Sequence, residues 1–195
     1  MSTIAQLKDI VDNSTTDKNT IHSYLDLYQP LFEKKKETAK NILEIGICGG
    51  GSIKLWKDYF TNATIYALDI MELTDVSLEI KNDSRIKLYT SINAYNDNFF
   101  IDNFLNNPRR FDIVLDDGPH TKESMIIFIR NFSRVMTDDG ILVVEDVQDP
   151  NWIPELALAT PVELQKYIRV YDLRQTKGRY DDIVFTIDKT IDKTI

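Results

Sequence analysis

Short apolar runs alternate with amphipathic segments along most of the chain. The apolar runs predict strands, which fall at 41–46, 64–69, 86–90, 111–116 and 140–145. Apolar residues at helical spacing predict helices, which cover 3–12, 22–36, 52–60, 72–81, 97–106 and 121–136. Strands that alternate with helices indicate βαβ units with right-handed crossovers, and therefore an α/β fold with a mostly parallel sheet.

The alternation stops after Asn151, where two strand-like runs follow one another. "KYIRVYDLR" at 166–174 and "DIVFTID" at 182–188, joined by the turn "QTKGRYD", predict an antiparallel hairpin at one edge of the sheet. The repeated "TIDK" near the C-terminus is too short to indicate a repeat architecture, and 189–195 is expected to fray. We expect a single domain over 1–195, in which the helices of 1–36 contribute to a cleft.

Composition narrows the classes of protein to which the chain can belong. Its 195 residues are 43% hydrophobic and 28% charged, which is typical of a globular domain. The net charge of −8 argues against a general nucleic-acid-binding surface, which must be basic. Cys48 is the single cysteine, so no disulfide framework can form. There is no signal-peptide core and no apolar run of about 20 residues, so we expect a cytoplasmic protein without a membrane span.

A glycine-rich turn, "LEIGICGGGS" at 43–52, follows the first predicted strand. Its consecutive glycines let the backbone approach a ligand, and the next helix offers unpaired N–H groups at its start. Gly46 and Gly51 match the ends of the dinucleotide fingerprint G-x-G-x-x-G, but the middle position is Cys48. Because a pyrophosphate needs glycine there, NAD is disfavoured.

Two carboxylates near this turn indicate a different ligand. Glu44, two residues before Gly46, suits a cationic ligand such as a sulfonium amino acid with a free ammonium group. Asp69 ends the second strand, where a carboxylate commonly accepts hydrogen bonds from both ribose hydroxyls. Taken alone, the same residues are equally compatible with a tight turn and a strand-end cap.

Two further predicted strands end in adjacent carboxylates, in "FDIVLDDGPHTKES" at 111–124 and "GILVVEDVQD" at 140–149. Unpaired buried charge is costly, so acids at the edge of a core need water, a partner or a ligand. A simple turn after Asp116, a histidine before an N-capping Thr121 and solvated charges at Glu145 and Asp146 would explain the same residues without a ligand.

Taken together, "ILEIG", "GGGSIKLWKDYF", "IYALDI", "FDIVLDDGPH" and "GILVVEDV" resemble class I S-adenosylmethionine-dependent methyltransferases. The resemblance is greatest to the metal-dependent sugar O-methyltransferases of macrolide and glycoside tailoring, which include the mycinamicin and rhamnosyl-tetracenomycin 2-O-methyltransferases. It runs from about Asp17 to Asp149 and includes the lead-in "TDKNTIHSY" at 16–24. It implies a Rossmann-like fold with a mostly parallel seven-stranded sheet, a C-terminal antiparallel hairpin and helices on both faces.

The resemblance also implies metal-binding and catalytic residues. In the family, the second Asp of the DDG segment and the Glu-Asp pair after the next strand bind Mg²⁺, which implies Asp117, Glu145 and Asp146 as ligands here. The histidine of the DDG segment is the family's proposed general base, which implies that His120 and Asp117 are catalytic. The family usually has Ser where this chain has Pro119, a change that alters the turn before His120.

Residues implied to bind S-adenosylmethionine come from the glycine turn and the strand ends around it, namely Glu44, Gly46, Gly49, Gly50, Gly51, Ser52, Asp69, Ser91 and Asp116. The family has an acidic residue for adenine near Ser91, so this chain departs from the pattern there. The lead-in segment is expected to face the substrate through Lys18, His22 and Tyr24.

General chemistry agrees with a shared metal site. Strands that end near Gly46, Asp116 and Glu145 are expected to be neighbours, in the order first, fourth, fifth, and adjacent strands lie about 4.8 Å apart. An all-oxygen ligand set favours Mg²⁺ or Mn²⁺ over Zn²⁺. A divalent ion that holds two neighbouring hydroxyls lowers their pKa, and a histidine such as His120 can then accept the proton.

These features predict a divalent-metal-dependent O-methyltransferase that uses S-adenosylmethionine and acts on a sugar hydroxyl of a glycan or glycoside. A catechol-like or other small-molecule acceptor, and a non-catalytic S-adenosylmethionine-binding module on the same fold, remain alternatives. A nicotinamide oxidoreductase is disfavoured by Cys48 and Glu44. We expect a small-molecule or glycan partner, and the chain is also expected to be able to form a homo-oligomer.

Overall fold

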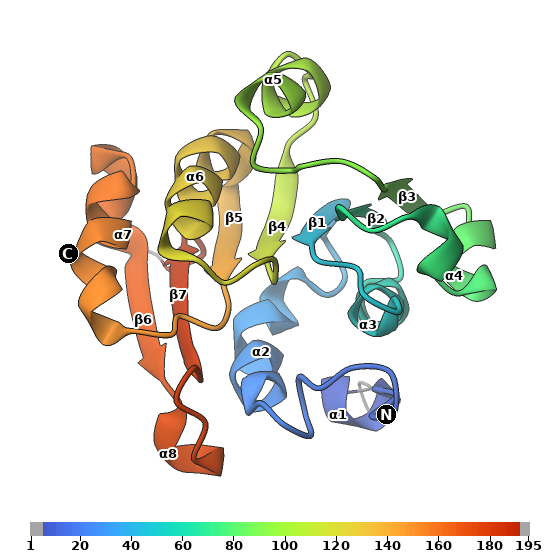
Figure 1. Cartoon of the computed structure of the whole chain (residues 1–195), viewed down its shortest axis with the longest axis horizontal. Helices are drawn as coiled ribbons and strands as arrows, with labels where there is room; N and C mark the ends of the chain where they lie inside the picture. The colour runs from blue at the N-terminus through green and yellow to red at the C-terminus, as the bar shows by residue number, and fades with distance from the viewer. Residues whose placement is uncertain (1–5, 192–195) are drawn as a thin grey trace.

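The structure, a computed structural model, describes residues 6–191 and is built on one seven-stranded sheet (Figure 1). The strand order is β3-β2-β1-β4-β5-β7-β6. The strands are β1 Asn41–Ile45, β2 Thr64–Leu68, β3 Ile86–Tyr89, β4 Phe111–Asp116, β5 Met136–Val144, β6 Ile168–Asp172 and β7 Ile183–Asp188. The first five strands pair in parallel, and β7 pairs antiparallel with both β5 and β6.

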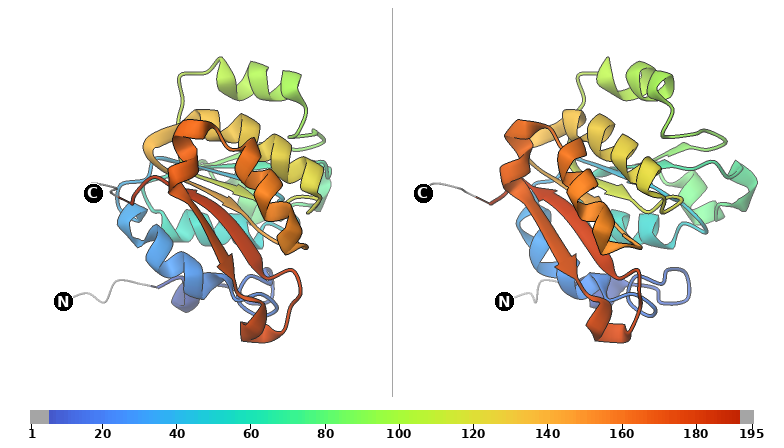
Figure 2. Two further views of the ribbon diagram at one scale, coloured as in Figure 1. Left: turned by 90° about the vertical axis from the view of Figure 1, so that its left-hand side faces the viewer. Right: turned by 60° about the vertical axis from the view of Figure 1, so that its left-hand side comes forward.

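Helices cover both faces of the sheet, as Figure 2 shows. One face carries α1 Leu7–Ile10, α2 Tyr24–Phe32 and α3 Gly51–Tyr59, and the other carries α5 Asp97–Phe100, α6 Lys122–Phe132 and α7 Ile153–Ala159. Two further helices are α4 Leu78–Asn82, before β3, and α8 Arg174–Lys177, between β6 and β7. Short 3₁₀ or π segments are η1 Glu33–Lys35, η2 Leu73–Asp75, η3 Ile101–Leu105, η4 Ser133–Val135, η5 Pro150–Trp152 and η6 Val162–Tyr167.

Alternate side chains of the central strands pack into two separate cores. Ile42 of β1 and Ile113 of β4 pack in the core that includes α2 and α3. Leu43 and Val114, the next residue on each strand, pack on the opposite face with α5, α6 and α7. Because both faces are covered, the central strands are apolar at nearly every position, which is why their sequences appear as continuous apolar runs.

The predicted strand alternation, the neighbouring positions of the first, fourth and fifth strands, and the C-terminal hairpin are confirmed. Several helix boundaries differ from the prediction. The helix predicted over 22–36 ends at Phe32 and contains Pro30, and those predicted over 72–81 and 97–106 are each split into two short segments. Helix α7 was not predicted, because its second residue is Pro154 and its sequence is short.

The carboxyl ends of β1, β4 and β5 lie side by side. Ile45 pairs with Asp116, and Asp116 pairs with Val144. Beyond these pairs, the Asp117 N–H donates to the Ile45 carbonyl at 2.9 Å, and the Glu145 N–H donates to the Asp116 carbonyl at 3.0 Å. Backbone pairing therefore extends one residue past β4 and β5 and holds Asp117 and Glu145 at adjacent strand tips.

Two further expectations concern the C-terminus of the chain and membrane insertion. The fraying expected for 189–195 falls partly on 192–195, which lie outside the described residues. Within 6–191, no helix combines the length and apolar character needed to cross a membrane. The cytoplasmic location stays a prediction.

Candidate active site

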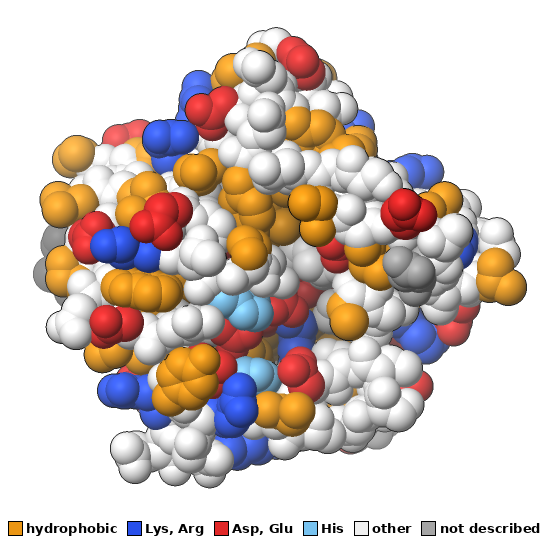
Figure 3. Space-filling view, in the orientation of Figure 1, with side chains coloured by type: hydrophobic (Ala, Val, Ile, Leu, Met, Phe, Trp, Pro, Cys, Tyr) orange, Lys and Arg blue, Asp and Glu red, His pale blue; other side chains and the backbone are white. Residues whose placement is uncertain are grey.

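A large cavity opens at the carboxyl ends of the parallel strands, where open α/β sheets bind ligands. Its volume is about 1140 Å³. Part of its wall is the segment 13–22, which we call the N-terminal loop, and the rest comes from the loops that follow β1 to β5. In Figure 3 the hollow contains acidic side chains between the two histidines of the chain.

Glycines shape the loop after β1 at positions where a side chain does not fit. Gly46 has a φ of +102°, and a Cβ on it would lie 2.0 Å from the carbonyl oxygen of Asp117. Gly50 has a φ of +92° and precedes the first residue of α3. A Cβ on Gly51 would lie 2.0 Å from the carbonyl oxygen of Thr15 in the N-terminal loop. These close approaches place the first turn of α3 at the cavity wall.

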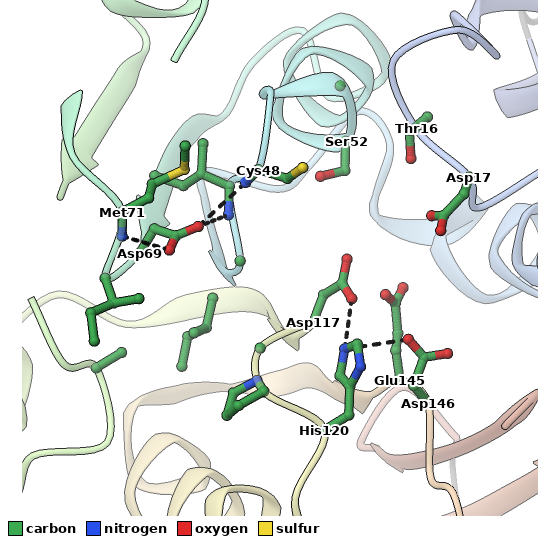
Figure 4. A pocket seen from close by; sticks show the side chains of 18 of the residues that line it. Thr16, Asp17, Cys48, Ser52, Asp69, Met71, Asp117, His120, Glu145 and Asp146 are labelled. Carbon is green, nitrogen blue, oxygen red and sulfur yellow. Dashed lines mark hydrogen bonds and ion pairs between the residues drawn. The ribbon is translucent and has the colours of Figure 1, made fainter. Parts of the chain in front are cut away.

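Asp69, just past β2, binds backbone groups of the loop after β1, residues 46–51, which we call the glycine loop (Figure 4). Its Oδ2 accepts hydrogen bonds from the backbone N–H groups of Ile47 at 2.7 Å and Cys48 at 3.3 Å. Its Oδ1 accepts from the backbone N–H of Met71 at 2.9 Å. The carboxylate therefore fixes the shape of the loop, lines the cavity and keeps acceptor capacity for a hydroxyl donor.

Side chains from the loops after β4 and β5 lie close together on another part of the cavity wall. The Nε2 of His120 lies 3.1 Å from Asp117 Oδ1 and 3.3 Å from Asp146 Oδ2 (Figure 4). One ligand atom from each of these three residues lies within 4.8 Å of the others. Two carboxylates and one imidazole at this spacing can hold a metal ion, and the predominance of oxygen favours a hard divalent cation.

Glu145 lies next to this group but has other partners. Its Oε2 is in direct contact with the ammonium of Lys18, and its Oε1 accepts a hydrogen bond from the Tyr28 hydroxyl at 2.5 Å. The Lys18 ammonium also lies 2.7 Å from Asp117 Oδ2 and 3.6 Å from Glu44 Oε1. Lys18 is thus a buried cation among three carboxylates.

Burial and the neighbouring charges shift the pKa values of Asp117, His120 and Asp146. Burial acts to raise the pKa of Asp117, but the Lys18 ammonium and the hydrogen bond with His120 lower it to about 2. Burial acts to lower the pKa of His120, but the hydrogen bond with Asp117 and the charge of Asp146 raise it above its ordinary value. Burial raises the pKa of Asp146. The neighbouring carboxylates therefore favour the protonated form of His120.

Two buried carboxylates lie behind the cavity wall. Asp116 accepts a hydrogen bond from the Tyr95 hydroxyl, and burial raises the pKa of Asp116 to about 7. Glu44 is fully buried, and its Oε2 accepts hydrogen bonds from Ser52 Oγ at 2.9 Å and Trp56 Nε1 at 2.8 Å. Burial raises the pKa of Glu44 to about 7. The Asp116 and Glu44 carboxylates therefore support the loops around the cavity through these hydrogen bonds.

A second histidine lies beside Asp146. The Nδ1 of His22 is 2.6 Å from Asp182 Oδ1 and 3.4 Å from Asp146 Oδ1, and its ring stacks on Tyr24 at a centroid distance of 4.8 Å. The Tyr24 hydroxyl donates to Asp146 Oδ1. His22 and Tyr24 therefore hold one Asp146 oxygen, while the other oxygen is close to His120.

The structure brings together some of the residues predicted from the sequence and not others. Those that line the cavity are Gly46, Gly51, Ser52, Asp69, His22, Tyr24, Asp117, His120, Glu145 and Asp146. Within residues 6–191, those outside the cavity lining are Lys18, Glu44, Gly49, Gly50, Ser91 and Asp116. Lys18 was predicted to face the substrate and Glu44 the cofactor, yet both are buried behind the wall.

Three residues that contact the cluster were not singled out from the sequence, namely Tyr28, Tyr95 and Asp182. Tyr28 follows Tyr24 by one helical turn, so its position on the buried face of α2 was predictable but its hydroxyl contact was not. Tyr95 lies in a loop, where periodicity gives no signal, and Asp182 immediately precedes β7, at the start of the run predicted as a strand over 182–188.

Comparisons with known proteins find relatives by sequence and by structure. No protein-family model matches the chain. It is 26% identical over 144 residues to the 8-demethyl-8-alpha-L-rhamnosyl tetracenomycin-C 2'-O-methyltransferase of Streptomyces olivaceus, covering 70% of this chain and 36% of that protein. It is 28% identical over 139 residues to the mycinamicin VI 2''-O-methyltransferase of Micromonospora griseorubida, covering 68% and 33%. The chain thus spans about a third of the length of these relatives.

Solved structures share the fold. The MycE methyltransferase of the mycinamycin biosynthetic pathway, solved in complex with Mg, SAH and mycinamycin VI, has a TM-score of 0.72 at 22% identity, over 96% of this chain and 55% of that one. The O-methyltransferase from Bacillus cereus in complex with SAH has a TM-score of 0.56 at 17% identity, over 83% and 79%. These likenesses confirm the resemblance seen in the motifs: the chain has the Rossmann-like fold of class I S-adenosylmethionine-dependent methyltransferases, and its sequence relatives are O-methyltransferases, one of them of a rhamnosyl tetracenomycin.

Proposed function

We propose that this chain carries an O-methyltransferase site that uses S-adenosylmethionine and a divalent metal ion and acts on a sugar hydroxyl of a glycoside or glycan. The observation that carries the proposal is the convergence of Asp117, His120 and Asp146 in the same cavity as the glycine loop and Asp69. Sequence relatives that are O-methyltransferases for a rhamnosyl tetracenomycin and for mycinamicin VI support the acceptor class.

The glycine-loop side of the cavity fits S-adenosylmethionine. Gly46 and Gly51 let the backbone approach closely, and the Asp69 carboxylate has remaining capacity to accept hydrogen bonds from ribose hydroxyls. The wall there is largely apolar and suits the adenine ring, with contributions from Ile45, Ile47, Ile70, Met71, Ile92 and Ala94. Glu44 would not contact the cofactor but would orient Ser52, which lies at the start of α3.

The acidic side of the cavity fits Mg²⁺ or Mn²⁺. Asp117 Oδ1 and Asp146 Oδ2, which both face His120, would hold the ion. Glu145, the third predicted ligand, is joined to Lys18 and Tyr28. When bound, a divalent ion supplies the positive charge that lowers the pKa of an acceptor hydroxyl.

His120 would accept the hydroxyl proton at Nε2. His120 lies beside the two acids that would hold the ion, so it is placed to take the proton of a hydroxyl bound there. Its ring lies at the cavity wall, so it can approach a bound acceptor. S-adenosylmethionine, when bound, would supply the methyl group, with an O–C bond formed as the sulfonium C–S bond breaks and S-adenosylhomocysteine leaves. The residues of the cavity would contribute by positioning the two reactants.

His22 and Tyr24 would contact the sugar. Both line the cavity beside Asp146, and together with the polar side chains of the N-terminal loop they give this part of the wall hydrogen-bonding groups. A polar wall next to a metal site suits an acceptor with several hydroxyls better than a flat aromatic ring.

The test is methyl transfer from labelled S-adenosylmethionine to a panel of acceptors, run with Mg²⁺ and with a chelator. We expect label on glycosides that have neighbouring free hydroxyls, loss of transfer with the chelator, and recovery when Mg²⁺ or Mn²⁺ is restored. Exclusive transfer to catechols would overturn the sugar assignment. Binding of S-adenosylhomocysteine with no transfer to any acceptor would favour a non-catalytic module.

A further inference from the structure

We infer that His22 Nε2 and Asp17 Oδ2 form a subsite for one hydroxyl of the acceptor, and that Asp182 is a positioning residue that fixes the His22 ring for this contact. The inference rests on the proposed function, because the hydroxyl would belong to the sugar. It adds a binding point on the N-terminal loop to the acidic groups at the strand tips.

Asp182 is a fully buried carboxylate that faces His22. Its Oδ1 lies 2.6 Å from His22 Nδ1. Within residues 6–191, its Oδ2 has no hydrogen-bond partner. A buried carboxylate with one unpaired oxygen is costly to folding, so a role in the adjacent site explains its presence better than a contribution to stability does.

The contact with Asp182 determines which nitrogen of His22 faces the cavity. Carboxylates only accept hydrogen bonds, and Nδ1 faces two of them, Asp182 Oδ1 at 2.6 Å and Asp146 Oδ1 at 3.4 Å. Nδ1 therefore carries a proton. The ring is also held by stacking on Tyr24 at a centroid distance of 4.8 Å. The other ring nitrogen, Nε2, is thus the one available to a ligand.

His22 and Asp17 are spaced so that they can share one hydroxyl. His22 Nε2 lies 3.8 Å from Asp17 Oδ2, which is too long for a direct hydrogen bond. Both residues line the cavity, the Asp17 side chain is 55% exposed, and Figure 4 shows the Asp17 carboxylate directed into the pocket. A hydroxyl oxygen about 2.8 Å from each atom can hydrogen-bond with both, because a hydroxyl both donates and accepts.

Residues 173–182, which we call the β6–β7 connection, also hold the backbone of the N-terminal loop at this point. The Asp17 carbonyl accepts hydrogen bonds from the N–H groups of residues 20–22, which closes a turn. Lys177, the last residue of α8, donates from Nζ to the His22 carbonyl at 2.7 Å and contacts the Asn19 carbonyl. Figure 2 shows α8 next to this loop. The β6–β7 connection therefore fixes both the backbone and the ring of His22.

The first part of the test is NMR of the full chain labelled with ¹⁵N-histidine. The chain has two histidines, so His120→Asn assigns both sets of ring signals. We expect His22 Nδ1 to be protonated in wild type. In Asp182→Asn the protonated fraction of Nδ1 should fall, because an asparagine amide can donate to it. An unprotonated Nδ1 in wild type, or the same ring signals in both proteins, would overturn the role of Asp182.

Asp188→Asn is the matched control for this measurement. Asp188 is a buried acid at the other end of β7, away from the cavity lining. The variant should give the His22 ring signals of wild type. A change as large as that in Asp182→Asn would show that the signals report a general disturbance of β7, and the assignment to Asp182 would be wrong.

The second part measures methyl transfer to the glycoside that wild type labels best in the acceptor panel. Asp182→Asn should raise the KM for this glycoside by about tenfold and change kcat by less than about threefold, because it weakens a binding contact and leaves the transfer step in place. Affinity for S-adenosylhomocysteine should stay within about threefold of wild type. A fall in kcat at unchanged KM would overturn the binding role.

A double-mutant cycle separates positioning from a purely structural role. If Asp182 acts through the imidazole, Asp182→Asn/His22→Gln should have the same KM for the glycoside as His22→Gln alone. Effects on KM that multiply would show that Asp182 acts by another route, and the inference would be wrong.

Asp17→Ala tests the subsite independently, at an exposed residue, even if Asp182→Asn fails to fold. It removes the second partner of the hydroxyl and should raise the KM for the glycoside by about tenfold. An unchanged KM would overturn the shared subsite.

Lys177→Met should also raise the KM, because the turn that carries His22 loses its hold. Lys87→Met is the matched control, since Lys87 Nζ likewise donates to a carbonyl, that of Ser84 at 3.1 Å, but away from the cavity lining. Equal KM values in the two lysine variants would overturn the contribution of Lys177.

The outcomes separate this inference from the proposed function. If wild type labels no glycoside, the proposed function fails and the acceptor subsite fails with it, while the NMR measurement still decides whether Asp182 holds His22 Nδ1. If wild type transfers methyl groups to a glycoside but the variants of Asp17, His22 and Asp182 all keep its KM, the inference alone is wrong.

Discussion

His120 and Asp146 come from different loops, yet His120 Nε2 lies 3.3 Å from Asp146 Oδ2. Both residues have a φ of +53°, in the left-handed region that non-glycine residues seldom adopt. Such conformations cost about 1–3 kcal/mol each and are concentrated at functional sites. The loops after β4 and β5 thus both bend in a way that brings a proton acceptor and a carboxylate to one point.

Substitution of His120 should impair transfer without impairing binding. His120→Asn is the preferred variant because asparagine tolerates a left-handed backbone better than most residues. We expect kcat to fall by about 10²–10⁴-fold, the usual contribution of a general base. Affinity for S-adenosylhomocysteine, measured by calorimetry, should stay close to wild type because His120 does not contact the glycine loop. A variant with near-normal kcat would show that another group accepts the proton.

Neutralisation of the two cavity-facing acids should separate metal binding from cofactor binding. Asp117→Asn and Asp146→Asn should each reduce Mg²⁺-dependent transfer by more than about a hundredfold, since each removes a charged ligand. Affinity for S-adenosylhomocysteine should change by less than about threefold, equivalent to under 1 kcal/mol. Asp138→Asn, at an exposed acid far from the cavity lining, is the matched control. Equal loss of cofactor binding in either variant would indicate a structural role.

Gly46 should not tolerate a side chain, whereas nearby Gly49 should. Gly46 has a φ of +102°, and its Cβ would lie 2.0 Å from the Asp117 carbonyl, while a Cβ on Gly49 would have no neighbour within 4 Å. We expect Gly46→Ala to lower the free energy of unfolding by about 2 kcal/mol or more and to weaken S-adenosylhomocysteine binding. Gly49→Ala should resemble wild type in both measurements. Similar behaviour of the two variants would contradict the loop geometry.

Titration of Glu44 should make folding stability fall as the pH rises. Burial raises the pKa of Glu44 from 4.5 to about 7. The folded protein therefore binds this proton more tightly than the unfolded chain, so the contribution to stability is full below about pH 4.5 and is lost by about pH 7. Glu44→Gln removes the titration but keeps an acceptor for Ser52 and Trp56.

Urea unfolding at several pH values checks this prediction. Between about pH 5 and pH 8, the free energy of unfolding should fall by roughly 2 kcal/mol less in Glu44→Gln than in wild type. Glu37→Gln, at an exposed position, is the control and should follow the wild-type curve. Parallel curves for Glu44→Gln and wild type would mean that Glu44 is already ionised across this range.

Much of the sheet was predictable from sequence, for a physical reason. Strands β1 and β4 are covered on both faces, so their apolar runs are nearly uninterrupted, and the acids that end them mark the sheet edge. Helix α7 was missed because Pro154 looks like a helix breaker, although proline is well tolerated in the first turn of a helix.

The site was predictable only in part. Asp117 and Asp146 follow adjacent parallel strands, so their proximity follows from topology. The burial of Lys18 does not, because this lysine lies in a polar loop, 99 positions before Asp117 in the sequence. Glu44 was expected to reach the cofactor, but side chains alternate along a strand, and only the three-dimensional packing shows that Glu44 is directed toward Ser52 and Trp56.

The most direct test of a shared cofactor and metal site is an anomalous difference map from crystals grown with S-adenosylhomocysteine and Mn²⁺. We predict a manganese peak between Asp117 and Asp146, with the nucleoside bound along the glycine loop in the same cavity. A map with no manganese peak at these two acids, while the nucleoside is clearly bound, would contradict the proposed metal-dependent mechanism.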